Sequence, residues 1–153
     1  MPRVSRSRVI SAERGRIWDL VSDPHNLPRW WPRALRVEDV REAAGEPAQW
    51  TTVLETARGT GVRADFRRVS ASDRRSCVWE QEVEGTPFER ILRSSRLEIE
   101  LDGDRETRVT LTTQEALRGL SRLGSAMMRG ASRRRLDEAL AGIERALVGE
   151  PGG

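Results

Sequence analysis

The chain has 153 residues, of which 33% are charged and 37% hydrophobic, and its formal net charge is +3. That length suits one domain with a single sizeable core, and no apolar run approaches the roughly 20 residues of a membrane-spanning helix. All 27 basic residues are arginine, which keeps the isoelectric point near 10.6 despite the small net charge. Because no long apolar run is present, we expect no membrane insertion. Because arginines alternate with acidic residues instead of clustering, we expect no nucleic-acid binding.

Cysteine and histidine each occur once in the chain. The single cysteine, Cys77, excludes an internal disulfide and favours a reducing compartment, so we expect a cytoplasmic protein. The basic N-terminus lacks a following apolar segment and predicts no secretory signal. His25 is the only histidine and has no metal-ligand spacing, so we expect no metal and no cofactor. No nucleophile–base pattern is present, and no catalytic residue is assigned.

Residues 10–32 predict a strand that leads into two short helices. An apolar stripe at helical spacing covers residues 17–21. The helix ends before Pro24, because the residue preceding a proline avoids the α region. A second short turn carries Trp30 and Trp31. Two adjacent tryptophans between prolines cannot both point inward, so we expect one of them at a cavity entrance or in an exposed patch.

Seven strands are predicted by residue alternation with period 2, separated by turn signals. The short turns indicate antiparallel neighbours, and Asp102-Gly103 is the clearest hairpin signal. One face of the strands is mostly apolar and the other is polar, as in a sheet covered on one side. The predicted strands are Arg3–Ile10, Ala34–Arg41, Gln49–Ala57, Val62–Ala71, Ser76–Val83, Glu89–Leu101 and Thr107–Ala116.

A long helix from about Leu120 to Leu147 is the only candidate to cover the apolar face. Its two halves carry their apolar residues on nearly opposite sides. Either the helix breaks near Gly130, or its first half faces the sheet differently from its second. The run Arg133–Arg135 is expected on a solvated face. We expect residues 1–148 to form one domain and residues 149–153 a disordered tail.

The chain resembles the START-like, helix-grip (SRPBCC) superfamily, also called the polyketide cyclase/dehydrase and lipid-transport family. The resemblance rests on the opening over residues 10–32, on the strand Thr107–Thr112, and on the ending over residues 119–140. It implies an α+β helix-grip fold: a seven-stranded antiparallel sheet curved around a long C-terminal helix, with two short helices between strands 1 and 2. In that superfamily the sheet and helix enclose an apolar cavity. Its members include hormone and lipid carriers, aromatic polyketide cyclases and oxygenase subunits.

Candidate ligand-binding residues are aromatic, flexible or polar side chains on positions that face the apolar side. Tryptophans can equally plug the core, and methionines can be ordinary gap fillers. Polar side chains in the inward phase are either anchors in a pocket or lie in water at a strand end, and Arg93 could pair with Glu115. The residues expected to contact a ligand are Trp30, Trp31, Trp50, Leu54, Phe66, Trp79, Gln81, Arg93, Ser95, Leu97, Thr113, Glu115, Leu123, Met127 and Met128.

These observations favour a monomer or homodimer that binds a small hydrophobic ligand, either aromatic polyketide-like or lipid-like, between sheet and helix. The alternative is a cyclase or aromatase that acts on a poly-keto substrate in the same cavity. A third possibility is an interaction module that uses exposed tryptophans or an arginine face. Fold alone does not decide among them.

Overall fold

The structure, a computed structural model, describes residues 3–42, 48–56, 58–119 and 122–148, without the side chains of residues 122 and 123. The predicted tail at 149–153 and the predicted helix start at Leu120 lie outside these residues. Among the described residues, no helix is long and apolar enough to cross a membrane.

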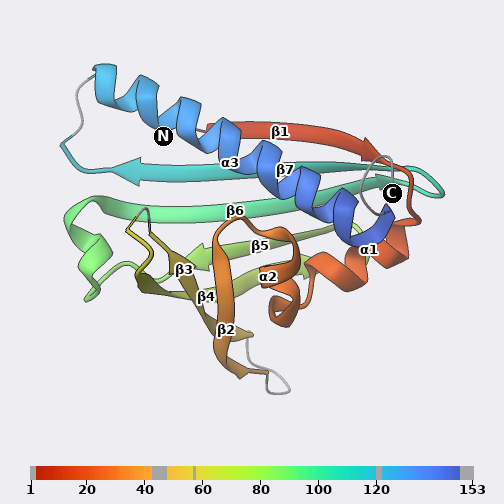
Figure 1. Cartoon of the computed structure of the whole chain (residues 1–153), viewed down its shortest axis with the longest axis horizontal. Coiled ribbons are helices and arrows are strands. Elements are labelled where there is room, and N and C mark those ends of the chain that lie inside the picture. The colour runs from red at the N-terminus through yellow and green to blue at the C-terminus, as the bar shows by residue number, and fades with distance from the viewer. Residues whose placement is uncertain (1–2, 43–47, 57, 120–121, 149–153) are drawn as a thin grey trace.

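A seven-stranded antiparallel sheet forms the body of the molecule (Figure 1). Each strand from β2 to β6 pairs with the next along the chain, and β1 pairs with β7, which gives the order β1-β7-β6-β5-β4-β3-β2. The strands are β1 Arg3–Ile10, β2 Ala34–Arg41, β3 Gln49–Glu55, β4 Gly61–Ser72, β5 Ser76–Gln81, β6 Leu92–Gly103 and β7 Thr107–Leu117.

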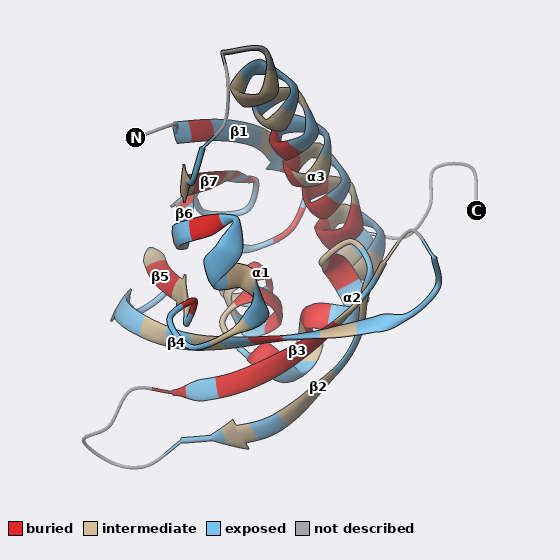
Figure 2. Cartoon of the chain, turned by 90° about the vertical axis from the view of Figure 1, so that its left-hand side faces the viewer, coloured by how far each residue is buried: buried red, intermediate tan, exposed pale blue. Residues whose placement is uncertain are grey.

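Helical segments close the open side of the curved sheet. Viewed from its end in Figure 2, the sheet curves from β1 round to β2, and the long C-terminal helix α3 lies along the gap. This helix contacts β1, β7, α1 and α2. The arrangement is the predicted α+β helix-grip fold. The helical segments are α1 Arg14–Val21, the 3-10 turn η1 Pro24–Asn26, α2 Leu27–Trp30, the 3-10 turn η2 Pro87–Arg90, and α3 Arg122–Val148.

The predicted hairpin at Asp102-Gly103 joins β6 to β7. Gly103 has a φ of +119° and pairs in register with Thr107. A Cβ at Gly103 would lie 2.3 Å from the carbonyl oxygen of Glu106, so only glycine fits this corner. The hairpin fixes the register of β6 and β7, which form the longest paired ladder of the sheet and carry much of the interior wall.

Strand boundaries differ from the prediction on either side of Pro87. The predicted strand Glu89–Leu101 begins only at Leu92, because η2 occupies Pro87–Arg90. Pro87 fixes φ at a helical value at the start of this turn, and the turn competes with strand extension. Strand β5 ends at Gln81, two residues earlier than expected.

Helix α3 runs without a break from Arg122 to Val148, so the predicted interruption near Gly130 is wrong. The other expectation holds, since the two halves of the helix meet different surroundings. Leu136, Leu140 and Ile143 are fully buried against the sheet, whereas Met127 is 68% exposed. The second half of α3 therefore provides the apolar cover, and the first half extends past the packed core.

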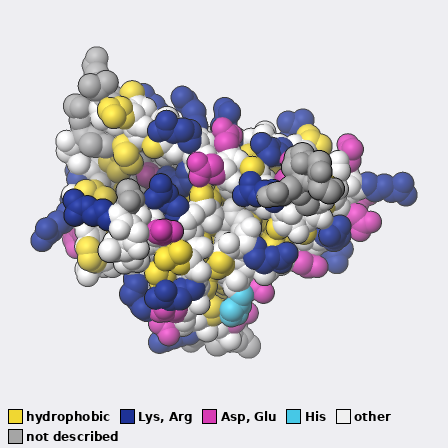
Figure 3. Space-filling view, in the orientation of Figure 1, with side chains coloured by type: hydrophobic (Ala, Val, Ile, Leu, Met, Phe, Trp, Pro, Cys, Tyr) yellow, Lys and Arg dark blue, Asp and Glu magenta, His cyan; other side chains and the backbone are white. Residues whose placement is uncertain are grey.

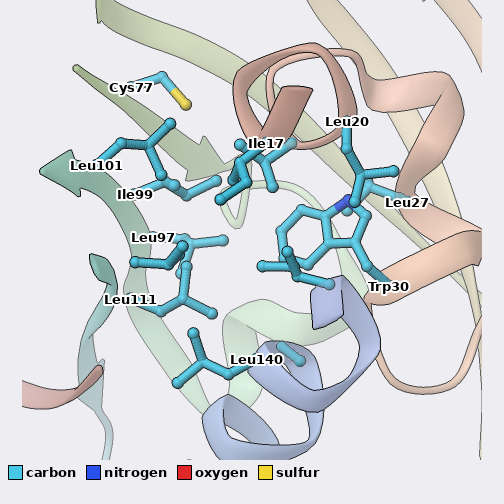
Figure 4. Packing of buried hydrophobic residues seen from close by; sticks show 14 of the residues in the cluster. Ile17, Leu20, Leu27, Trp30, Cys77, Leu97, Ile99, Leu101, Leu111 and Leu140 are labelled. Carbon is cyan, nitrogen blue, oxygen red and sulfur yellow. The ribbon is translucent and has the colours of Figure 1, made fainter. Parts of the chain in front are cut away.

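The core fills the end of the interior beneath α1 and α2. In Figure 4, Ile17, Leu20 and Trp30 from the short helices face Ile99 and Leu140, which come from β6 and α3. Toward the other end of β6 and β7 the inward residues become smaller or more polar: Ser95 follows this change on β6, and Thr113 and Glu115 follow it on β7. This change in side-chain type separates a packed half of the interior from a hollow half.

Candidate functional site: an apolar cavity between sheet and helix

A cavity of about 230 Å³ occupies the interior beside the packed core. Its wall comes from α2, strands β3 to β7, η2 and α3. One wall residue, Ile91, is 58% exposed, which places the mouth at the junction of η2 and β6. Figure 3 shows hydrophobic side chains, with arginines around them, at the surface of the end where α3 begins.

Aromatic rings form one continuous side of this cavity. Trp50 and Phe66 are cross-strand partners on β3 and β4, and their rings stack with centroids 6.1 Å apart. The ring of Trp50 meets Trp79 on β5 edge-on at 5.1 Å. Trp31, at the end of α2, and Phe88, in η2, also line the cavity. Such rings offer large apolar faces for a flat ligand.

An ion pair lies in the cavity wall opposite the aromatic side chains of β3 and β4. The Nη2 atom of Arg135 on α3 donates to Glu115 Oε1 on β7 at 2.7 Å and to Ser132 Oγ at 3.3 Å. The Glu115 side chain is 15% exposed and that of Arg135 is 39% exposed. Each charge is therefore compensated at the site, and the pair as a whole is neutral.

Several wall residues carry buried polar atoms without a hydrogen-bond partner among the described residues. These atoms are Nε1 of Trp50 and Trp79, Oγ1 of Thr52, Nε2 of Gln81 and Nε of Arg135. Buried polar groups are normally paired, because leaving one unpaired costs about 1–3 kcal/mol. A sixth such atom, Nε1 of Trp30, lies in the core behind the wall.

Neither the single cysteine, Cys77, nor the single histidine, His25, lies in the cavity wall. Burial raises the pKa of the Cys77 thiol to about 12, so the thiol stays protonated at neutral pH in the core beneath α1. His25 is exposed in η1, with its Nδ1 atom 2.9 Å from Asp23 Oδ1. Among the described residues, no group of three or more His, Cys, Asp or Glu side chains could hold a metal ion.

Most of the residues expected to bind a ligand do lie at the cavity wall. They come from five strands, from α3 and from the end of α2, and the strand register explains the proximity of those on the sheet. For example, Trp79 pairs with Leu97, which in turn pairs with Thr113. The expected residues found in the wall are Trp31, Trp50, Leu54, Phe66, Trp79, Gln81, Ser95, Leu97, Thr113, Glu115 and Met128.

The prediction that Arg93 faces the cavity is wrong, because this residue is exposed and does not line the cavity. A β-bulge explains the error: Leu92 pairs with Leu117 and Ser94 with Ala116, which leaves Arg93 as an extra residue on β6. The bulge shifts the inward phase from Ser95 to Leu92 and turns Arg93 outward. The partner of Glu115 in the structure is Arg135, and not Arg93 as expected.

Two further expected residues are outside the wall. Met127 is 68% exposed, since the first half of α3 turns this position to solvent. Trp30 is 2% exposed and packs in the core behind the wall, with ring centroids 5.7 Å from Trp31 and 6.1 Å from Trp79. One of the two adjacent tryptophans was expected at a cavity entrance or in an exposed patch, and Trp31 lines the cavity. The side chain of Leu123 lies outside the described residues.

Sequence reasoning missed eight wall residues, some of which had a usable signal. Thr52 shares the inward phase of Trp50, and Arg135 lies seven positions after Met128, two helical turns along the same side of α3. Arg135 was instead expected on a solvated face. The bulge on β6 and the turn η2 had no such signal. The missed residues are Leu27, Thr52, Phe88, Ile91, Leu92, Arg96, Leu117 and Arg135.

Solved structures with the same fold include two named aromatase/cyclases. The Zhui aromatase/cyclase from a Streptomyces species has 17% identity and a TM-score of 0.75, over 94% of this chain and 91% of that one. The di-domain ARO/CYC BexL has 19% identity and a TM-score of 0.76 over 95% of this chain. This chain spans about half of the di-domain protein, 46% of its length.

A START superfamily protein from Mycobacterium smegmatis is similar over nearly its full length. The match covers 95% of this chain and 97% of that chain, with 14% identity and a TM-score of 0.77. At these identities the structural likeness establishes the fold alone. No curated protein matches the sequence.

The sequence profile of one family matches almost the whole chain. The profile is described as "Polyketide cyclase / dehydrase and lipid transport" and covers residues 1–148. That range includes every strand, the helix α3 and all the wall residues of the cavity. The chain therefore belongs to the polyketide cyclase/dehydrase and lipid transport family.

Proposed function

We propose that the chain binds a small, largely apolar ligand, aromatic or lipid-like, in the cavity between the sheet and α3. The observation that carries the proposal is the wall itself: aromatic and aliphatic side chains with a few polar groups among them. Ligand sites typically have this composition. Apolar cavities of roughly 150 Å³ admit benzene, so about 230 Å³ suits a molecule of one or two aromatic rings.

A panel of one- and two-ring aromatics and short-chain lipids tests this function by calorimetry and by the shift in melting temperature. A ligand at 100 times its dissociation constant should stabilise the protein by about 2.7 kcal/mol. The blocking variant is Ser95→Met, which places a larger side chain in the cavity wall. The matched control is Ser94→Met, which is half-buried but lies outside the wall.

Binding that is lost in Ser95→Met and kept in Ser94→Met is the expected result. Equal affinities in both variants would place the ligand elsewhere on the molecule. A folded wild-type protein that binds nothing in the panel would overturn the proposal.

A second candidate is an aromatase/cyclase-type enzyme that uses the same cavity. The observations that favour it are the Glu115–Arg135 pair in the wall and the similarity in fold to two named aromatase/cyclases. Incubation with a poly-keto thioester discriminates between the two functions. A carrier releases the compound with the same distribution of products as in buffer, whereas an enzyme changes that distribution, and Glu115→Gln then reduces the change.

A further inference from the structure

A second hollow lies on the outside of the molecule, in an open groove where α2 meets α3. Its volume is about 420 Å³, and residues 28–33 line it on one side and α3 lines it on the other. The two helices approach closely here, since a Cβ at Gly142 would lie 2.4 Å from the carbonyl oxygen of Trp30. In Figure 3, which has the orientation of Figure 1, arginine side chains lie over the region where α2 and α3 meet.

The groove carries more positive than negative charge. Arg29 and Arg33 line it from the α2 side, and Arg145 lines it from α3. All three side chains are exposed, and within the described part of the chain none of them has an ion-pair or hydrogen-bond partner. Glu138 is the one acidic residue among the described residues that line the groove. Two positive charges therefore remain uncompensated there.

The other acidic residues of this part of α3 are already paired with β1. Asp137 Oδ1 lies 2.9 Å from Arg6 Nε, and Glu144 Oε1 lies 3.5 Å from Arg8 Nη1. Neither carboxylate can compensate Arg145 without giving up its existing partner. The excess of positive charge in the groove is thus a feature of the folded chain, although the net charge of the whole protein is only +3.

Arg33 holds a backbone conformation that glycine would adopt more easily. Its φ is +65°, in the left-handed region that residues with a Cβ rarely occupy. Its carbonyl oxygen accepts from the Glu55 N–H at 2.8 Å, which fixes the corner between α2 and β2. Glycine would fit this corner without strain, so the local fold does not require an arginine. Residues in strained conformations cluster at functional sites, and here the strained residue brings a guanidinium to the groove.

We propose that this groove binds a phosphate group that carries an apolar or aromatic substituent. Guanidinium groups form paired, charge-assisted hydrogen bonds with phosphate oxygens. A phosphate monoester carries nearly two negative charges at neutral pH, which matches the two uncompensated charges. Trp31 and Pro32 also line the groove and offer apolar surface to the substituent. Among the described residues only Trp31 also lines the cavity between sheet and helix, so the inference is independent of the proposed ligand-binding function.

Calorimetric titrations with inorganic phosphate and with 1-naphthyl phosphate, at neutral pH and low salt, test this site. The naphthyl ester should bind about 3- to 10-fold more tightly than phosphate, because its rings bury apolar surface. Both affinities should fall about 10-fold when the salt concentration is raised from about 20 mM to about 500 mM, because exposed charges are screened. Ser95→Met, which obstructs the cavity between sheet and helix, should leave both affinities unchanged.

Arg33→Gly separates the role of the side chain from that of the fold. It should weaken 1-naphthyl phosphate binding about 5-fold or more, because it removes a guanidinium, while the urea midpoint stays equal or rises, because it relieves the backbone strain. Arg145→Gln should weaken binding by a similar factor from the other side of the groove. The matched control is Arg74→Gly: Arg74 is exposed and has a φ of +58° but lies outside the groove, so the affinity should stay at the wild-type value.

Equal losses of affinity in Arg33→Gly and Arg74→Gly would indicate general attraction of anions to an arginine-rich surface, and would overturn the site. Wild-type affinity in Arg33→Gly or in Arg145→Gln, or no binding of either phosphate at low salt, would also overturn it. Loss of 1-naphthyl phosphate binding in Ser95→Met would assign this ligand to the cavity and contradict the groove. A lower urea midpoint for Arg33→Gly would make the arginine structural and contradict the argument from its backbone. None of these four results affects the proposed function of the cavity.

Discussion

Replacing Gly142 with alanine is expected to destabilise the protein, although alanine is the better helix former. Gly142 lies on the buried face of α3, where the helix crosses α2. A Cβ there would lie 2.4 Å from the carbonyl oxygen of Trp30 and 2.9 Å from its Cα. Both are main-chain atoms, so no side-chain rotation relieves the overlap, and the two helices must separate.

Gly130 in the same helix is the matched control, because a Cβ there meets nothing within 4 Å. Both replacements gain the same helix propensity, up to about 1 kcal/mol, and this gain cancels in the comparison. The difference that remains is the cost of overpacking, about 1–3 kcal/mol. Gly130→Ala should be stabilised and Gly142→Ala should not.

Urea denaturation followed by tryptophan fluorescence measures both variants. With a slope of about 2 kcal/mol per M, the midpoint of Gly142→Ala should lie about 0.5–1.5 M below that of Gly130→Ala. Because Trp30 packs against Trp31 and Trp79 in the cavity region, the native emission of Gly142→Ala should also change. Equal midpoints for the two variants would refute the close contact between α3 and α2.

Four further predictions concern charge and exposure. The chain has no lysine and no tyrosine, so Cys77 is the side chain expected to titrate between pH 9 and 12. Because burial raises its pKa from 9.0 to about 12 in the folded state, stability is complete below pH 9 and falls by up to about 1.4 kcal/mol per pH unit from 9 to 12. Urea melts of Cys77→Ala should lose this slope, and an unchanged slope contradicts the burial. Glu115→Ala should cost about 1–2 kcal/mol, between the values for exposed and buried pairs, because it leaves Arg135 uncompensated. Arg93→Ala should change stability by less than about 0.5 kcal/mol, and a cost equal to that of Glu115→Ala would restore the discarded Arg93 pairing. Met127→Ser should leave both stability and ligand affinity unchanged, and reduced affinity would return Met127 to the cavity.

Local patterns in the sequence predicted the strands and their antiparallel pairing, and the family resemblance predicted how the strands and helices are arranged. Alternation with period 2 and the Asp102-Gly103 turn depend on residues close together in the chain, and the structure keeps both. The exposure of the first half of α3 follows from tertiary packing. Whether Met127 faces the sheet depends on where the helix crosses it, and helical spacing alone does not determine that position.

The residues of the site were predictable where inward and outward side chains alternate without interruption along a strand. They were not predictable where a bulge reverses that alternation. Trp50, Trp79 and Thr113 lie in unbroken stretches of strand, and they reach the wall as alternation requires. By alternation alone Arg93 would also face inward. The bulge on β6 inserts one residue, so the Arg93 side chain points outward instead. To place Arg135 in the wall, one must know how α3 is rotated about its axis as well as the spacing of its residues. Spacing alone is not enough, because the same run of arginines also fits a solvated face.

The most direct test of the account is an experimental structure of the protein crystallised with 2-acetylnaphthalene. We expect the naphthalene ring in the cavity, against Trp79 and Phe66. Ligand density on the outer face of the sheet, or a cavity filled by rearranged side chains at saturating ligand, would contradict the account.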